Sequence, residues 1–101
     1  MNRIVYLPVA RQDMMGIALY IADRLKAPRT ALELLDALEE AIARLDRFPL
    51  SCPAYQPLRP LDAEYRMLPV RNFLVFYVVL EDTVEVHRIL YCKRQLGPEM
   101  L

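Results

Sequence analysis

Apolar and polar positions follow two different periods along the chain, and the change of period separates strands from helices. Residues Arg3 to Val9 form a short β-rich run, in which Pro8 indicates a sheet edge or the end of the strand. From Arg11 the apolar residues recur at three- and four-residue steps, which is the pattern of one helical face. We expect Pro28 to stop this helix.

A second amphipathic helix follows at once. Thr30 is a suitable N-cap and Glu33 stands three residues later, so the pair predicts a capping box. The apolar stripe then continues until Pro49. Because the connection between the two helices is short, they should form an αα-hairpin.

The rest of the chain predicts a crossover loop and three strands. Residues 49–61 carry four of the eight prolines, so this segment is neither regular helix nor central strand. Strands are expected at Tyr65–Val70, Phe73–Leu80 and Val84–Tyr91, joined by short hairpin turns. The predicted fold is α+β, with the order β-α-α-β-β-β over one domain, residues 1–101. The helical hairpin should lie on one face of a small, largely antiparallel sheet.

The strand Phe73–Leu80 is apolar on both faces. Two helices cover only one face of a sheet, so the second face needs sheet curvature and the terminal tail, or a partner, to exclude water. We favour a partner. The faces alternate, one with Phe73, Val75, Tyr77 and Val79, and the other with Leu74, Phe76, Val78 and Leu80.

The last strand alternates less regularly. Arg88 interrupts an otherwise apolar face, and Ile89 interrupts the polar one. This predicts a β-bulge or a change of side near these two residues.

Composition narrows the possible functions. The 101 residues have a formal net charge of zero and a pI near 6.6, so no long-range field favours nucleic acid or anionic lipid. No apolar run reaches the ~20 residues of a membrane helix, and the N-terminus lacks a signal-peptide core, so we expect a cytoplasmic protein. With one histidine and two glycines, the sequence predicts neither a metal site nor a phosphate-binding loop, and no cofactor.

Several motifs resemble one known family. The segment "YRMLPVRNFLVFYVVLEDTVEVHRILYCKR" is similar to the signature of the ParE/RelE superfamily of bacterial toxins. The segments "PVARQDMMGIALYIAD" and "LLDALEEAIARLDRFP" resemble the family's two helices. The resemblance covers almost the whole chain, with the motifs in the family's order.

This resemblance implies the toxin of a type II toxin-antitoxin system, also called a plasmid stabilisation protein. Such a toxin is inhibited by a cognate antitoxin, ParD-like or other, whose C-terminal segment wraps around it. RelE-type members cut mRNA on the ribosome, whereas ParE-type members poison DNA gyrase.

The residues favour the ParE-type activity. RelE-type toxins resemble one another in carrying an Arg after the turn aromatic of the third strand, where this chain has Leu74. A leucine cannot stabilise phosphate charge, and a neutral domain suits ribosomal RNA poorly. We therefore expect a gyrase poison that acts by binding, without sequence-specific contacts of its own to nucleic acid. Ribosome-dependent mRNA cleavage is the alternative, and a degenerate, non-toxic interaction domain is the third hypothesis.

Candidate site residues follow from position and charge. Lys93, Arg94, Arg66 and Arg88 could form a target-binding surface, although each could equally be a solvated charge or an ion-pair partner. We favour the functional interpretation for Lys93 and Arg94, because the family places functional side chains there. His87 is interpreted as a surface residue, so no catalytic residue is assigned. The candidates for antitoxin binding are Leu74, Phe76, Val78 and Met14.

Overall fold

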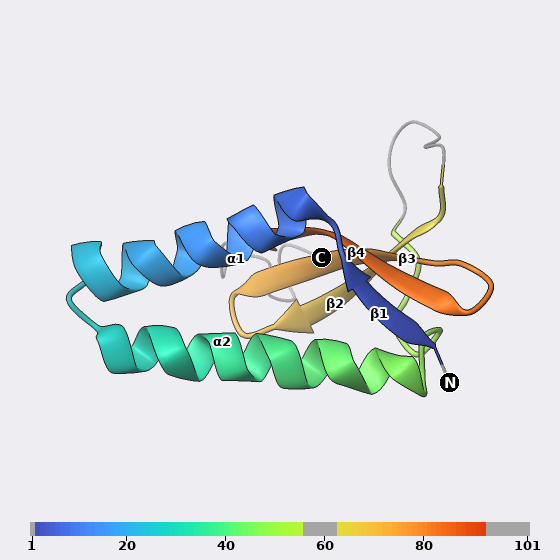
Figure 1. Ribbon diagram of the computed structural model, residues 1–101, viewed down its shortest axis with the longest axis horizontal. Coiled ribbons are helices and arrows are strands. Elements are labelled where there is room, and N and C mark those ends of the chain that lie inside the picture. The colour runs from blue at the N-terminus through green and yellow to red at the C-terminus, as the bar shows by residue number, and fades with distance from the viewer. Residues whose placement is uncertain (1, 56–62, 93–101) are drawn as a thin grey trace, which may run out of the picture.

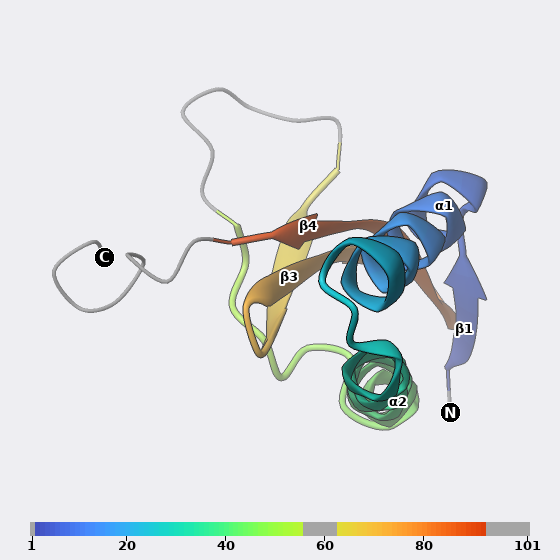
Figure 2. The same cartoon turned by 90° about the vertical axis from the view of Figure 1, so that its left-hand side faces the viewer.

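The computed structural model describes residues 2–55 and 63–92, which form a helical hairpin packed on a sheet. Figure 1 shows the two long helices running side by side, and Figure 2 shows them together on one side of β2, β3 and β4. The predicted α+β class and element order are confirmed. The elements are β1 (Arg3–Tyr6), α1 (Pro8–Leu19), a π-helical turn (Tyr20–Arg24), α2 (Pro28–Ala43), a 3-10 turn (Arg44–Asp46), β2 (Tyr65–Val70), β3 (Phe73–Val79) and β4 (Thr83–Tyr91).

Prolines begin both helices of the hairpin. Pro8 is the first residue of α1, and Pro28 is the first residue of α2. Proline suits this position because it has no N–H to leave unpaired and its φ is already helical. The expected strand end at Val9 and helix start at Arg11 were therefore wrong, since β1 ends at Tyr6.

The connection between the helices also differs from the expectation. Ala27 is the N-cap of α2, and no side chain caps this helix, so the predicted capping box of Thr30 and Glu33 is wrong. Pro28 is the first helical residue instead, so the helix starts three residues earlier than the capping box predicted. Lys26 reverses the chain with φ 56°, in the left-handed region that residues with a Cβ rarely adopt.

The sheet has the strand order β1-β4-β3-β2. β1 pairs with β4 in parallel, whereas β2–β3 and β3–β4 are antiparallel. β2 has the predicted bounds, while β3 ends at Val79 and β4 begins at Thr83, each one residue before the expected position. In the tight turn between β2 and β3, Arg71 has φ 55°, as a two-residue hairpin turn requires of its first central residue.

A β-bulge interrupts the pairing of β3 with β4, as the broken alternation predicted. Phe76 pairs with Arg88, but the next residue, Tyr77, pairs with Val86, which leaves His87 as the extra residue of β4. The bulge lets Val86 and Ile89 both face the helices, where they are buried. Arg88 consequently lies on the opposite face.

The core lies between the helices and one face of the sheet. Its largest fully buried side chains are Tyr77, Leu38, Ile42, Ile89, Val75, Val84 and Val86. We call the face turned away from the helices the open face. In β3, the side chains of Leu74, Phe76 and Val78 lie on the open face, because they alternate with the core residues of that strand.

The segment after α2 packs against the sheet and reaches the free edge of β2. Regular α-helix ends at Ala43, before the Pro49 at which the sequence placed its end. Tyr77 donates a hydrogen bond of 2.8 Å from its hydroxyl to the Pro49 carbonyl. The Tyr55 N–H then donates to the Tyr65 carbonyl at 2.7 Å, so this segment pairs with the free edge of β2.

Candidate functional site

A hollow of about 380 Å³ lies on the open face, around the bulge. The Tyr55 ring packs edge-on against Phe76, with 5.4 Å between the ring centroids. Residues Leu7, Val9, Tyr55, Tyr65, Phe76, His87, Arg88 and Leu90 line the hollow. The hollow is open to solvent, and its lining is mostly apolar with few polar groups.

Three polar side chains form a hydrogen-bonded chain beside this hollow. The Tyr65 hydroxyl lies 3.1 Å from Nδ1 of His87, and Nε2 of the same ring lies 3.1 Å from Oε1 of Glu85. A carboxylate only accepts, so Nε2 donates to Glu85, and in the neutral ring Nδ1 accepts the Tyr65 proton. The imidazole is therefore held in one orientation, and the hollow carries a paired tyrosine and histidine.

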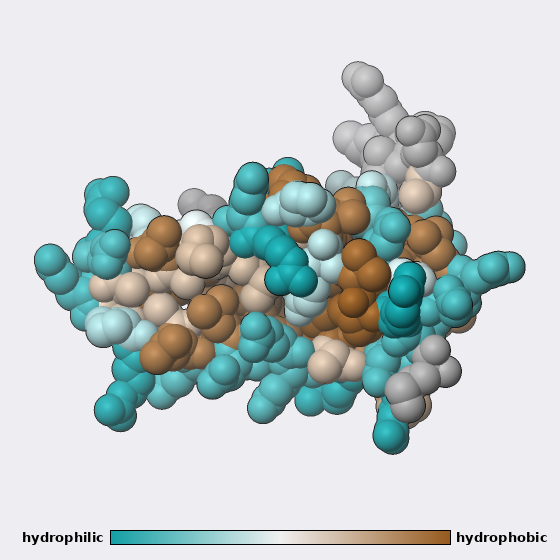
Figure 3. Space-filling model, in the orientation of Figure 1, coloured by the Kyte–Doolittle hydropathy of each residue, from teal (hydrophilic) through white to brown (hydrophobic). Residues whose placement is uncertain are grey.

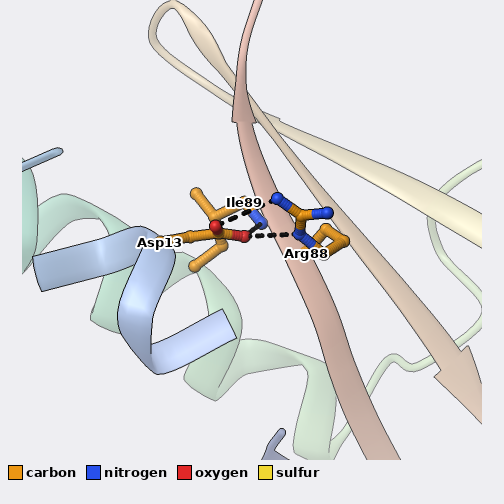
Figure 4. Close-up of polar contacts among 3 residues, drawn as sticks. All are labelled: Asp13, Arg88 and Ile89. Carbon is orange, nitrogen blue, oxygen red and sulfur yellow. Dashed lines mark hydrogen bonds and ion pairs between the residues drawn. The ribbon is translucent and has the colours of Figure 1, made fainter. Parts of the chain in front are cut away.

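An ion pair joins α1 to the bulge (Figure 4). The Asp13 carboxylate accepts hydrogen bonds from Nε of Arg88 at 2.8 Å, from Nη2 of Arg88 at 3.1 Å and from the Ile89 N–H at 2.9 Å. The two oxygens thus receive the guanidinium in a forked arrangement, which is the strong geometry for this pair. Asp13 is largely buried, with 15% of its side chain exposed, against 46% for Arg88.

The charge states of this pair support each other. Burial opposes ionisation of Asp13, but the hydrogen bonds from Arg88 and Ile89 outweigh it and hold the pKa of the carboxyl below its usual value. The hydrogen bond to Asp13 raises the pKa of the Arg88 guanidinium. Both groups are therefore charged at neutral pH.

A second cavity, which we call the groove, lies between α1 and the strand ends at the β2–β3 turn. It has a volume of about 840 Å³ and a mostly apolar lining. Its lining residues are Gln12, Asp13, Gly16, Ile17, Tyr20, Ile21, Leu25, Asn72, Phe73, Ile89, Leu90 and Tyr91. Asp13 lines the groove and Arg88 lines the hollow, so their ion pair stands between the two cavities.

Exposed apolar side chains extend beyond the groove. Figure 3 shows apolar surface along the band between the two helices. Met15, Leu19, Leu25 and Leu32 of the hairpin are each more than half exposed, as is Tyr91 at the end of β4. The hairpin and the end of β4 therefore present apolar surface of the kind that marks interaction sites.

The two cationic candidates among the described residues, Arg66 and Arg88, are held in different places. Arg66 donates a 2.6 Å hydrogen bond to the Cys52 carbonyl, and lies 3.9 Å from Glu64, so it ties the segment after α2 to β2. Arg88 is held by Asp13 at the bulge. Lys93 and Arg94 lie outside the described residues.

The apolar candidates occupy different environments. Leu74 lies on the open face between Pro69 and Leu90 of the neighbouring strands. Phe76 is half-buried against Tyr55, whereas Val78 is 6% exposed. Met14 belongs to the core, where it is 9% exposed.

Asp13 is the site residue that the sequence interpretation did not assign. Its helical neighbours Ala10, Met14 and Ile17 belong to or pack against the core, so a carboxylate among them was the available signal. The partner of a carboxylate at such a position must come from another element. Arg88, 75 residues later, supplies it.

Residues 2–55 and 63–92 contain neither a cluster of metal ligands nor a membrane-spanning helix. No group of three His, Cys, Asp or Glu side chains in these ranges could hold a metal ion. No helix there is long and apolar enough to cross a membrane.

Comparison with known proteins identifies similar chains. The model of the ParE toxin of the type II toxin-antitoxin system parDE matches residues 4–96. Among solved structures, the chromosomal ParDE toxin-antitoxin system from P. aeruginosa superposes with a TM-score of 0.75 at 19% sequence identity, covering 92% of this chain and 98% of that one. No curated protein matches. At this identity the structural likeness supports the fold, and the family match covers most of the chain.

Proposed function

The chain belongs to the ParE toxin family of type II toxin-antitoxin systems, and we propose that it poisons DNA gyrase and is neutralised by a cognate antitoxin. The toxin would bind gyrase and trap its complex with cleaved DNA, while gyrase itself breaks the DNA strands. The proposal requires a binding surface and no catalytic residue of the toxin.

The apolar side chains around Leu74 are the observation that favours gyrase over the ribosome as the target. Leu74 stands where RelE-type toxins resemble one another in carrying an Arg, and its cross-strand neighbours are Pro69 and Leu90. Three apolar side chains thus lie across the open face at the place where mRNA cleavage needs a cation against phosphate charge. This surface suits contact with a protein better than cleavage of RNA.

Supercoiling by purified gyrase tests the proposal. Increasing amounts of antitoxin-free protein should inhibit supercoiling and accumulate linear, cleaved DNA. Changing Lys93 and Arg94 together to Ala should remove this effect if the basic pair belongs to the target surface. The matched control changes Arg29 and Arg47, two exposed arginines of the helical part, to Ala.

The outcomes separate the hypotheses. Inhibition without cleaved DNA would contradict trapping, and no inhibition by a folded sample would contradict gyrase as the target. Full activity of the Lys93 and Arg94 double variant would remove that pair from the target surface.

The antitoxin is proposed to cover the groove and the adjoining apolar row. The groove is continuous with exposed Leu90 and Tyr91, which extends the candidate surface beyond Leu74. An amphipathic helix inserts its apolar side chains into a groove of this kind. Hydrogen exchange of the toxin with and without antitoxin should show added protection from Phe73 to Tyr91, and its absence would contradict this placement.

Ribosome-dependent mRNA cleavage is the second candidate, and one observation favours it. The hollow brings together Tyr65, His87 and Arg88, which are residue types able to move a proton and to offset phosphate charge. In that case His87→Ala should lower mRNA cleavage on purified ribosomes while the chain stays folded. Cleavage by the wild-type protein, with gyrase unaffected, would replace the first proposal by this one.

A further inference from the structure

The Arg88 guanidinium has donors that the ion pair does not use. The Asp13 carboxylate accepts hydrogen bonds from the Nε–H and from one N–H of Nη2 of Arg88. Within residues 2–55 and 63–92, no hydrogen bond is made by Nη1 of Arg88. An arginine has five N–H donors in a fixed plane. The edge of the guanidinium formed by Nη1 and the second N–H of Nη2, which we call the outer edge, can therefore donate to an anion. Of the Arg88 side chain, 46% is exposed.

We propose that the hollow is a binding site for an apolar group that carries a carboxylate, with Arg88 as the anion donor and Asp13 as the residue that positions it. The group comes from a segment of a protein partner in which an aromatic side chain stands next to an Asp or Glu side chain, so that the ring fills the hollow and the neighbouring carboxylate binds Arg88. The inference rests on the proposed function only in taking that partner to be a protein. The site itself is a property of the isolated toxin.

The lining determines the apolar part of the ligand. Phe76 and Leu90 supply apolar surface from neighbouring strands, and Leu7 and Tyr55 come from segments on either side. A volume of about 380 Å³ accepts a single ring or branched side chain. Arg88 lines the same hollow, so a carboxylate on that group can reach its outer edge.

Charge favours a carboxylate over a phosphate backbone. The chain has no net charge, and Arg88 is the one cation that lines the hollow among the described residues. Nucleic-acid binding draws on several cations along the backbone, whereas one guanidinium matches one carboxylate in a forked contact. Glu85, hydrogen-bonded to His87 beside the hollow, adds negative charge that opposes a doubly charged phosphate more strongly than a single carboxylate.

Asp13 is required because arginine is long and flexible. A free side chain loses rotamer freedom when it binds an anion, and this loss weakens binding. The two hydrogen bonds to Asp13 fix the guanidinium plane beforehand. The bond from the Ile89 N–H fixes the carboxylate in turn. Asp13 thus acts through Arg88 and is a positioning residue.

His87 gives a direct test, because it is the sole histidine and lines the hollow. Its imidazole signals in NMR spectra of the full chain would be followed at constant pH and ionic strength during titration with phenylacetate. Phenyl phosphate and benzyl alcohol are the comparison probes. We expect a saturable shift with phenylacetate, weaker binding of benzyl alcohol, and no preference for phenyl phosphate.

Three variants separate an anion site from a purely structural ion pair. Arg88→Gln should weaken phenylacetate binding by about tenfold or more, the loss of a charge-assisted hydrogen bond. Arg88→Lys should restore part of the affinity, since it keeps the charge but not the fork. Asp13→Asn keeps an acceptor for the Ile89 N–H, and should weaken binding by several-fold through lost positioning. Arg29→Gln, on the exposed side of α2, is the control.

Each result decides a part of the proposal. An absent or non-saturable shift, or equal affinity for Arg88→Gln and wild type, would overturn the site. Preferred binding of phenyl phosphate would overturn the carboxylate assignment, and unchanged affinity in Asp13→Asn would overturn the role of Asp13. If Asp13→Asn does not fold, the two Arg88 variants still decide the site. Failure of gyrase inhibition leaves these outcomes untouched, so the two proposals fail separately.

Discussion

Asp13 is a mostly buried carboxylate whose charge is satisfied by another element of the fold. Its three hydrogen bonds link α1 to the strand at the opposite end of the chain. A group held in this way contributes to stability only while it is ionised. The residue that organises the hollow is therefore also a source of pH-dependent stability.

Asp13→Asn should make the free energy of unfolding less dependent on pH. The pKa of Asp13 is lower in the folded chain than in the unfolded one, so its contribution is present above the unfolded pKa and is lost as pH falls through the folded pKa. The variant should lose about 1–2 kcal/mol near neutral pH and less in acid. Denaturant unfolding across this range measures the difference, and a gap that widens in acid would contradict the role assigned to the carboxylate.

Tyr77→Phe tests the attachment of the segment after α2. Tyr77 is fully buried, and its hydroxyl donates to the Pro49 carbonyl, so removing it leaves that carbonyl without this donor. The free energy of unfolding should fall by about 1 kcal/mol. Amide exchange at Tyr55 should also become faster. Val75→Ala, an apolar truncation on the same strand, is the control, because it should reduce stability without selectively loosening that segment.

At the scale of elements, turns decided where the helices begin and end. Lys26 adopts φ 56° between the two helical segments, a conformation that glycine takes without strain. Lys26→Gly should therefore stabilise the chain by up to about 1 kcal/mol. Lys26→Ala, which keeps the Cβ, should not. Thermal unfolding of both variants measures the effect, and equal midpoints would mean that this conformation costs the native chain little.

The same local chemistry limited what the sequence could predict. Hydrophobic periodicity located the four strands and both α-helices of the described residues, because burial requires it whatever the neighbours are. It did not locate helix starts, since Pro8 and Pro28 were treated as terminators although proline also suits a first helical turn. The bulge was visible as broken alternation at Arg88. The ion pair with Asp13 was not visible, because residues 75 positions apart in the chain are brought together only by the tertiary fold.

At the scale of the molecule, two cavities lie on either side of the ion pair. The hollow belongs to the open face and the groove to the helix side, and Leu90 lines both. The predicted uncovered face was the open face alone, but Tyr55, in the segment after α2, covers part of it by packing against Phe76. Apolar surface is consequently left at the groove and at the end of β4.

Tyr91→Ala should separate antitoxin binding from stability. Tyr91 lines the groove, is 63% exposed, and its ring packs against Phe73 at 5.6 Å. Exposed aromatic residues at the centre of an interface often contribute most of its binding energy. The dissociation constant for the cognate antitoxin should therefore rise by about tenfold to a hundredfold, mainly through faster dissociation. The unfolding midpoint should change little, because a single exposed ring contact is lost.

Leu32→Ala provides the matched control for this prediction. Leu32 is 64% exposed, close to the value for Tyr91, but it lies on α2 and does not line the groove. Surface plasmon resonance on immobilised antitoxin compares the two variants with wild type. Equal losses for both would place the antitoxin across the whole hairpin, and a loss confined to Leu32→Ala would move its binding site to α2. A loss confined to Tyr91→Ala is the result that the groove predicts.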